Sequence, residues 1–140
     1  MRRLLCLLAV LPAACGRPAD AGRLLLDDGR RVAALVGAES TAVLFYDPSR
    51  CFSCGSTLPE WIAWRVTHPD QVRLVLTGTP TDGERRQLRA GHALVDGMVP
   101  GAGWMVEGRT MLVVLLVGGR EAWTGVAGPS QVFTPQQARQ

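Results

Sequence analysis

Three short runs of mostly apolar residues limit most strongly how this chain can fold. Each has the length of a β-strand, and they cover residues 41–46, 71–77 and 111–117. The first reads as a continuous apolar run, which is typical of a central strand covered on both faces. The sequence therefore predicts a buried sheet at the centre of the fold.

Two helices are expected beside the first two strands. Apolar residues recur at helical spacing over 52–67, which predicts a helix there. Thr81 followed by Glu84 predicts the start of a second helix that runs to about residue 91. The order strand, helix, strand, helix implies a right-handed parallel crossover.

In the second half of the chain, glycines predict a loop and a hairpin turn. Residues 96–110 are rich in glycine and are expected to form a loop. Gly118 and Gly119 then predict a tight hairpin that returns as an antiparallel strand over 120–126.

The patterns at the two ends of the domain are weaker. Residues 23–26 indicate a first strand, and 31–37 fit either a short helix or a strand. Thr134 before Pro135 predicts the cap of a short last helix.

The first 15 residues are laid out like an export signal and are not expected to belong to the fold. A basic start precedes an apolar stretch too short to span a bilayer, and small residues lead into Cys15. This order resembles a bacterial lipobox, which implies cleavage before Cys15 and lipid on its sulfur, although Pro12 departs from the pattern. An ordinary secretory signal is the alternative. Residues 16–22 are expected to form a tether and 23–140 one domain.

The length and net charge of the chain indicate one domain and do not favour nucleic-acid binding. Without the signal, 125 of the 140 residues remain, enough for one domain with one core. All 15 basic residues are arginines, and without the two in the signal the formal net charge falls from +3 to +1. Since no arginine cluster with interleaved aromatic residues is present, nucleic acid is not an expected partner.

Cys51 and Cys54 are the only thiols expected in the folded domain, because the other two cysteines lie in the N-terminal segment. A lone C-x-x-C pair in an oxidising compartment is a structural disulfide, a redox couple or half of a metal site. His68 and His92 do not complete a usual metal-ligand spacing with it. A metal or copper-carrying site therefore stays an alternative, and no cofactor is expected.

The residues around the pair favour thiol chemistry. A helix N-terminus and the adjacent Arg50 supply positive charge that stabilises a thiolate on Cys51. Cys54, one turn later, is placed to attack a mixed disulfide on Cys51 and release the partner. The sequence therefore predicts a nucleophile at Cys51 and a resolving thiol at Cys54.

These features resemble the thioredoxin superfamily, in particular its membrane-tethered TlpA/ResA-like and redoxin branches. The likeness rests on residues 43–46 running into Cys51 and Cys54, on Pro59 five residues further, and on residues 110–126, which are similar to the family's closing hairpin. It implies a thioredoxin-like α/β fold with a central mixed sheet of about four to five strands flanked by helices. Pro59 takes the place of the family's kink-forming helix proline.

The resemblance also implies an activity. We expect a thiol-disulfide oxidoreductase that serves exported proteins with disulfides or thiols and draws on an upstream electron donor. With the export signal, it implies a lipid-anchored protein at the outer face of the cytoplasmic membrane or in the periplasm. The oligomeric state stays open.

Two departures from the family keep other functions open. Arg50 stands where the family has a tryptophan, and Arg109 stands where it has a cis-proline that faces the cysteines. Peroxiredoxins carry an arginine at about that place, so a thiol peroxidase with Cys54 as its peroxide-reactive residue is one alternative. A non-catalytic binding lipoprotein with a structural disulfide is another.

Three side chains of the first expected helix have two interpretations each. Glu60 is a proton relay to the resolving thiol or an exposed helix residue, and the second is favoured. Trp61 and Trp64 form a substrate platform or pack on the helix surface and core, and packing is favoured.

Overall fold

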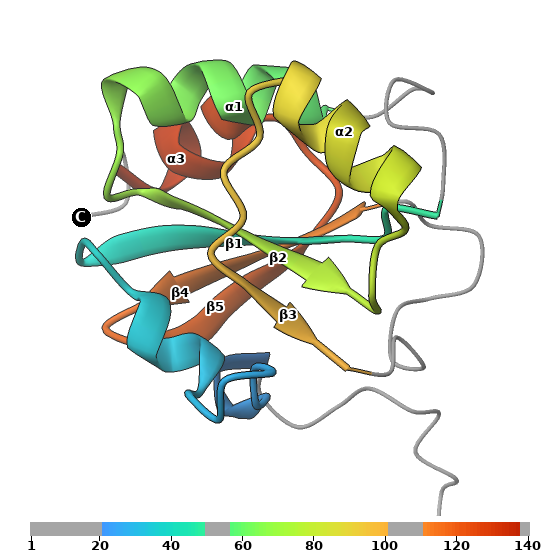
Figure 1. Ribbon diagram of the computed structural model, residues 1–140. Helices are drawn as coiled ribbons and strands as arrows, with labels where there is room; N and C mark the ends of the chain where they lie inside the picture. The colour runs from blue at the N-terminus through green and yellow to red at the C-terminus, as the bar shows by residue number, and fades with distance from the viewer. Residues whose placement is uncertain (1–20, 50–56, 101–110, 138–140) are drawn as a thin grey trace, which may run out of the picture.

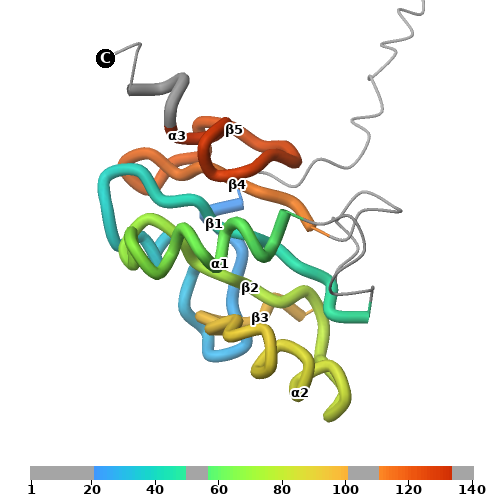
Figure 2. Tube along the Cα trace, turned by 90° about the horizontal axis from the view of Figure 1, so that it is seen from above, coloured from blue at the N-terminus to red at the C-terminus, as the bar shows by residue number. Residues whose placement is uncertain are grey.

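A mixed five-stranded sheet forms the centre of the protein. The computed structural model describes residues 21–49, 57–100 and 111–137 (Figure 1). In spatial order the strands are β3-β2-β1-β4-β5 (Figure 2). Their bounds are β1 Ser40–Tyr46, β2 Val72–Thr77, β3 Gly97–Val99, β4 Met111–Val117 and β5 Arg120–Gly125. The β1–β2 and β2–β3 pairs are parallel, whereas the β1–β4 and β4–β5 pairs are antiparallel.

The predicted fold class is confirmed by this sheet and by the helices beside it. The three apolar runs form β2, β1 and β4, which lie next to one another, and the two antiparallel strands form the predicted hairpin. Gly118 and Gly119 have φ angles of 57° and 79°. Glycine adopts such left-handed angles without steric cost, which allows the two-residue turn.

Different elements cover the two faces of the sheet (Figure 1). The helices α1 Leu58–Thr67, α2 Asp82–Ala90 and α3 Pro129–Gln137 lie on one face. The short 3₁₀ helices η1 Ala21–Arg23 and η2 Val32–Leu35 lie on the other. Along β1, Leu44 and Tyr46 point to the helices, whereas Val43 and Phe45 point to the 3₁₀ turns. All four are buried, as expected for a strand covered on both faces.

The expected first strand over residues 23–26 is wrong. The chain forms η1 there and then makes only an isolated antiparallel bridge between Leu25 and Arg31. Ala21 and Gly22, which fall in the expected tether, are buried, and the Ala21 backbone N–H donates to the Glu121 carboxylate on β5. These two residues therefore belong to the folded domain.

The expected loop over 96–110 contains a strand at its start. Residues Gly97–Val99 form β3, and residues 101–110 lie outside the described part of the chain. The Met98 backbone N–H donates to the Asp27 carboxylate, and the Asp27 backbone N–H donates to the Met98 carbonyl oxygen. A three-residue strand with a glycine gives no alternating pattern, so its sequence resembles a loop.

Two helix starts also differ from expectation. Thr57 stands at the N-cap position of α1 without a side-chain cap hydrogen bond, so Pro59 is the second residue of the described helix. Proline is well tolerated in the first turn because that N–H has no partner within the helix. The last helix begins at Pro129, so Thr134 and Pro135 lie inside α3 rather than at its start. Among the described helices, none has the length and apolar character needed to cross a membrane.

Candidate functional site

The carboxyl ends of the parallel strands meet the start of β4 at one edge of the sheet. Tyr46, the last residue of β1, pairs with Leu76 on one side and with Met111 on the other. Thr77, the last residue of β2, pairs with Val99 of β3. The chain therefore leaves β1 towards residues 50–56, and returns from 101–110 into β4, at this same edge.

The sequence-predicted chemical residues fall in those intervals. Arg50, Cys51 and Cys54 lie between β1 and α1, and Arg109 lies directly before β4, all outside the described residues. Cys15 lies outside them as well. Their roles stay predictions, and the described structure defines the elements that precede and follow them.

Hydrogen bonds fix the end of β1. The Thr77 hydroxyl donates to the Tyr46 carbonyl oxygen at 3.3 Å. Three residues after Tyr46, the Ser49 backbone N–H and hydroxyl both donate to the same Asp47 carboxylate oxygen, at 2.9 Å and 2.6 Å. This side-chain turn is a usual way for Asp to end a strand and redirect the chain. Residue 50 therefore follows a well-bonded turn.

The start of α1 is fixed by a carbonyl on another segment. The Ala127 carbonyl oxygen, between β5 and α3, accepts from Trp61 Nε1 at 2.9 Å and from the Thr57 hydroxyl at 3.4 Å. Leu58 and Trp61 are both buried in the core under the helices. The helix that follows the cysteines is thus fixed in position and direction at its first turns.

Aromatic packing confirms the structural interpretation of the two tryptophans. Trp61 meets Phe133 of α3 edge-on with a centroid distance of 6.0 Å, and Trp64 stacks on the same ring at 5.8 Å. Trp61 is fully buried. Both rings therefore join α1 to α3.

Glu60 is exposed, as favoured from the sequence, and it lies against Gly128 before α3. A Cβ atom built on Gly128 would come within 2.7 Å of the Glu60 carboxylate, so the glycine permits this close approach. The proton-relay interpretation of Glu60 stays untested because Cys54 lies outside the described residues.

Tyr46 is a buried titratable group at this edge that the sequence reasoning did not single out. Burial raises its pKa to about 12, and the negative charges of Asp47 and Glu84 act in the same direction. The phenol is therefore neutral near pH 7. Its position at the last residue of a buried strand before Cys51 is the signal that points to it.

The two histidines have local roles. His68 stacks on Trp64 at 4.4 Å, and its Nδ1 lies 2.8 Å from the Thr67 hydroxyl oxygen. His92 follows the end of α2 with a φ of 56°. Within residues 21–49, 57–100 and 111–137, no three metal-ligating side chains come together.

Comparison with known proteins identifies the fold. No protein-family model and no curated protein matches the sequence. Among solved structures, a domain of a possible thiol-disulfide isomerase from Cytophaga hutchinsonii is 15% identical, with a TM-score of 0.55 over 84% of this chain and 88% of its own. A secreted Mycobacterium tuberculosis disulfide oxidoreductase homologous to E. coli DsbE is 14% identical, with a TM-score of 0.52 over 84% and 94%. The chain therefore has a thioredoxin-like fold.

Proposed function

We propose that this protein is an exported, membrane-tethered thiol-disulfide oxidoreductase that uses Cys51 and Cys54 on the disulfides of other exported proteins. The observation that carries the proposal is the position of the C-x-x-C pair in the described topology. It lies between the end of the central strand β1 and the start of α1. The solved proteins of this fold that are described as thiol-disulfide isomerase and disulfide oxidoreductase support the same chemistry.

The exchange proceeds in two balanced steps. The Cys51 thiolate attacks one sulfur of the substrate disulfide, which breaks that bond, forms a mixed disulfide and releases one substrate thiolate. The Cys54 thiolate then attacks the Cys51 sulfur and releases the second substrate thiolate. Two electrons pass to the substrate, and the protein is left with a Cys51–Cys54 disulfide. An upstream electron donor is needed to restore the dithiol.

Positive charge is proposed to stabilise the attacking thiolate. Arg50 is adjacent to Cys51, and Arg109 is two residues before Met111, which pairs with Tyr46. Since β4 begins at the edge of the sheet where β1 ends, the proposal is that Arg109 brings its charge near Cys51 and lowers the pKa of that thiol.

The tether is proposed from the N-terminal sequence. Residues 1–15 act as the signal, Cys15 carries lipid, and the following residues connect it to the domain, whose first described residue is Ala21. The domain is then held at the outer face of the cytoplasmic membrane or in the periplasm.

Reduction of insulin by the reduced protein tests the activity. Wild type is expected to reduce insulin, Cys51→Ser to be inactive, and Cys54→Ser to retain mixed disulfides with partners. The reduction potential separates a redox couple, at about −120 to −270 mV, from a structural disulfide below about −300 mV. Peroxide consumption without insulin reduction would replace the proposal by a thiol peroxidase.

A further inference from the structure

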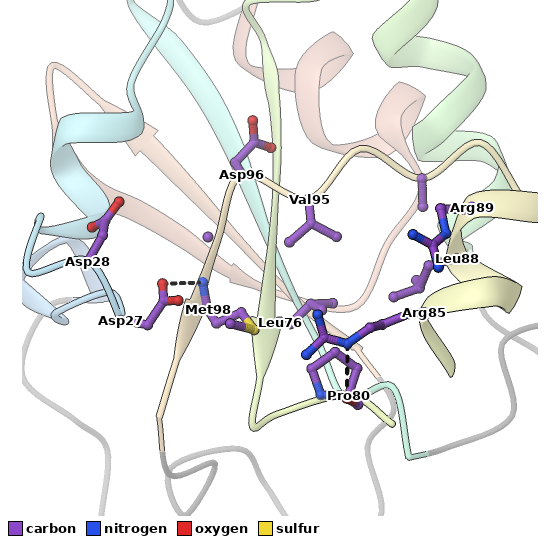
Figure 3. Close-up of a pocket in the computed structure, with 12 residues that line it drawn as sticks. Asp27, Asp28, Leu76, Pro80, Arg85, Leu88, Arg89, Val95, Asp96 and Met98 are labelled. Atoms are coloured by element: carbon purple, nitrogen blue, oxygen red, sulfur yellow. Dashed lines mark hydrogen bonds between the residues drawn. The ribbon is translucent and has the colours of Figure 1, made fainter. Parts of the chain in front are cut away.

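A cavity of about 390 Å³ lies between α2 and the edge of the sheet formed by β2 and β3 (Figure 3). Its apolar wall includes Leu76 from β2, Leu88 from α2 and Met98 from β3. The volume falls within the range of about 300–1,000 Å³ that is usual for small-molecule pockets. The cavity is therefore large enough for a small organic ligand.

Two arginines of α2 bring positive charge to this cavity. Arg85 and Arg89 are one helical turn apart, and both line the cavity and are exposed. Figure 3 shows Arg85 reaching from α2 towards Met98, with its Nε–H donating to the Pro80 carbonyl oxygen at 3.3 Å. Within the described parts of the chain, no carboxylate forms an ion pair with either guanidinium group. Most of their N–H groups are thus available to a ligand.

The acidic residues of the same cavity have other partners. Asp96 forms a two-bond ion pair with Arg65, and Asp28 forms one with the arginine two residues later. Asp27 accepts from the Met98 backbone N–H on the opposite side of the cavity (Figure 3). None of these contacts involves Arg85 or Arg89, so both guanidinium groups keep their charge for a ligand on the α2 side, whereas the negative charge of Asp27 lies on the β3 side.

We propose that the cavity binds a small organic carboxylate with an apolar body. The guanidinium groups of Arg85 and Arg89 hold the carboxylate through charge-assisted hydrogen bonds, for which the planar arginine fork is well suited. The apolar body packs on Leu88 and Met98 and loses contact with water. Both halves of the ligand are needed, because the cations alone are exposed and screened by salt.

Isothermal titration calorimetry of the full chain with 4-phenylbutyrate tests the site. Saturable binding is expected, with the uncharged 4-phenylbutanamide and the short anion acetate each weaker by at least about tenfold. Arg89→Gln is expected to weaken 4-phenylbutyrate binding by at least about tenfold. Arg85→Gln should act in the same direction.

Arg86→Gln is the matched control, because Arg86 is an exposed arginine on the same helix that does not line the cavity. It is expected to bind 4-phenylbutyrate like wild type. Circular dichroism verifies that each variant is folded, and Arg89→Gln removes no hydrogen bond of the described structure. The site is refuted by lack of saturable binding below about 1 mM, by equal binding of the amide or acetate, or by equal losses in Arg86→Gln and Arg89→Gln.

Discussion

The ion pair between Arg65 of α1 and Asp96 before β3 offers a sharp test of how this fold is held together. The guanidinium group donates to both carboxylate oxygens, at 2.7 Å and 2.9 Å. The same carboxylate accepts the Leu74 backbone N–H of β2 at 2.7 Å. The two charged side chains are only 18% and 17% exposed. Asp96→Ala therefore leaves a mostly buried cation and a strand N–H without their acceptor.

The expected cost follows from this burial. Removing one partner of a fully buried pair costs about 3–5 kcal/mol, and an unsatisfied backbone N–H costs about 1–3 kcal/mol. Because some water reaches this pair and Arg65 keeps a bond to the Leu94 carbonyl oxygen, we expect about 3 kcal/mol for Asp96→Ala. With an m-value of about 2 kcal/mol/M, the urea midpoint falls by roughly 1.5 M.

Urea unfolding followed by circular dichroism measures the change, and two controls make it specific. Asp28→Ala removes a pair of the same 2.7 Å length whose side chains are 52% and 44% exposed, so its midpoint should barely move. A double-mutant cycle with Arg65→Met should give a coupling energy above about 1 kcal/mol. Equal midpoint losses in Asp96→Ala and Asp28→Ala, or a coupling near zero, would refute the argument from burial.

Four further predictions concern the core residues Trp61 and Tyr46, the proposed thiols and the proposed membrane anchor. Trp61→Phe removes the Nε1–H bond to Ala127 and part of a buried ring, so the free energy of unfolding should fall by about 2 kcal/mol in urea titrations. Tyr46 is the single tyrosine, so ultraviolet absorbance should give its pKa near 12. The free energy of unfolding should fall as pH rises from 10 to about 12, because the unfolded state loses the phenol proton first. Tyr46→Phe should remove this fall. Alkylation of the reduced protein should modify Cys51 before Cys54. In Arg109→Ala the alkylation of Cys51 should need a higher pH, whereas an unchanged dependence of alkylation on pH would place Arg109 away from the thiol. Cys15→Ala should release the protein from membranes in a fractionation experiment, and unchanged membrane binding would contradict the lipid anchor.

The sequence predicts the elements whose signal is local. The strands β1, β2 and β4 are apolar runs of strand length, and the capping box of Thr81 and Glu84 is present at the start of α2. Apolar periodicity and capping depend only on neighbouring residues, so one sequence is enough to detect them.

Elements held by distant contacts could not be predicted in this way. β3 has three residues, and its backbone is joined to Asp27, which lies 71 residues from Met98 in the chain. The Arg65–Asp96 pair joins residues 31 apart, and nothing in the spacing of its members distinguishes it from solvated charges. For the site, the C-x-x-C motif was visible from the sequence, whereas the contacts of Tyr46 and Glu60 depend on packing between strands and helices.

The two attachments of α1 bear on how the proposed redox site can be tested. Near its start, Trp61 donates to the Ala127 carbonyl oxygen, and near its end Arg65 pairs with Asp96. Both attachments, and the stacking of Trp64 on Phe133, are independent of the cysteine side chains. A site that depends on geometry is best supported by a rigid element with its own packing. Substitutions of Cys51 or Cys54 should therefore leave α1 in place, so a loss of exchange activity in those variants reports on thiol chemistry and not on unfolding.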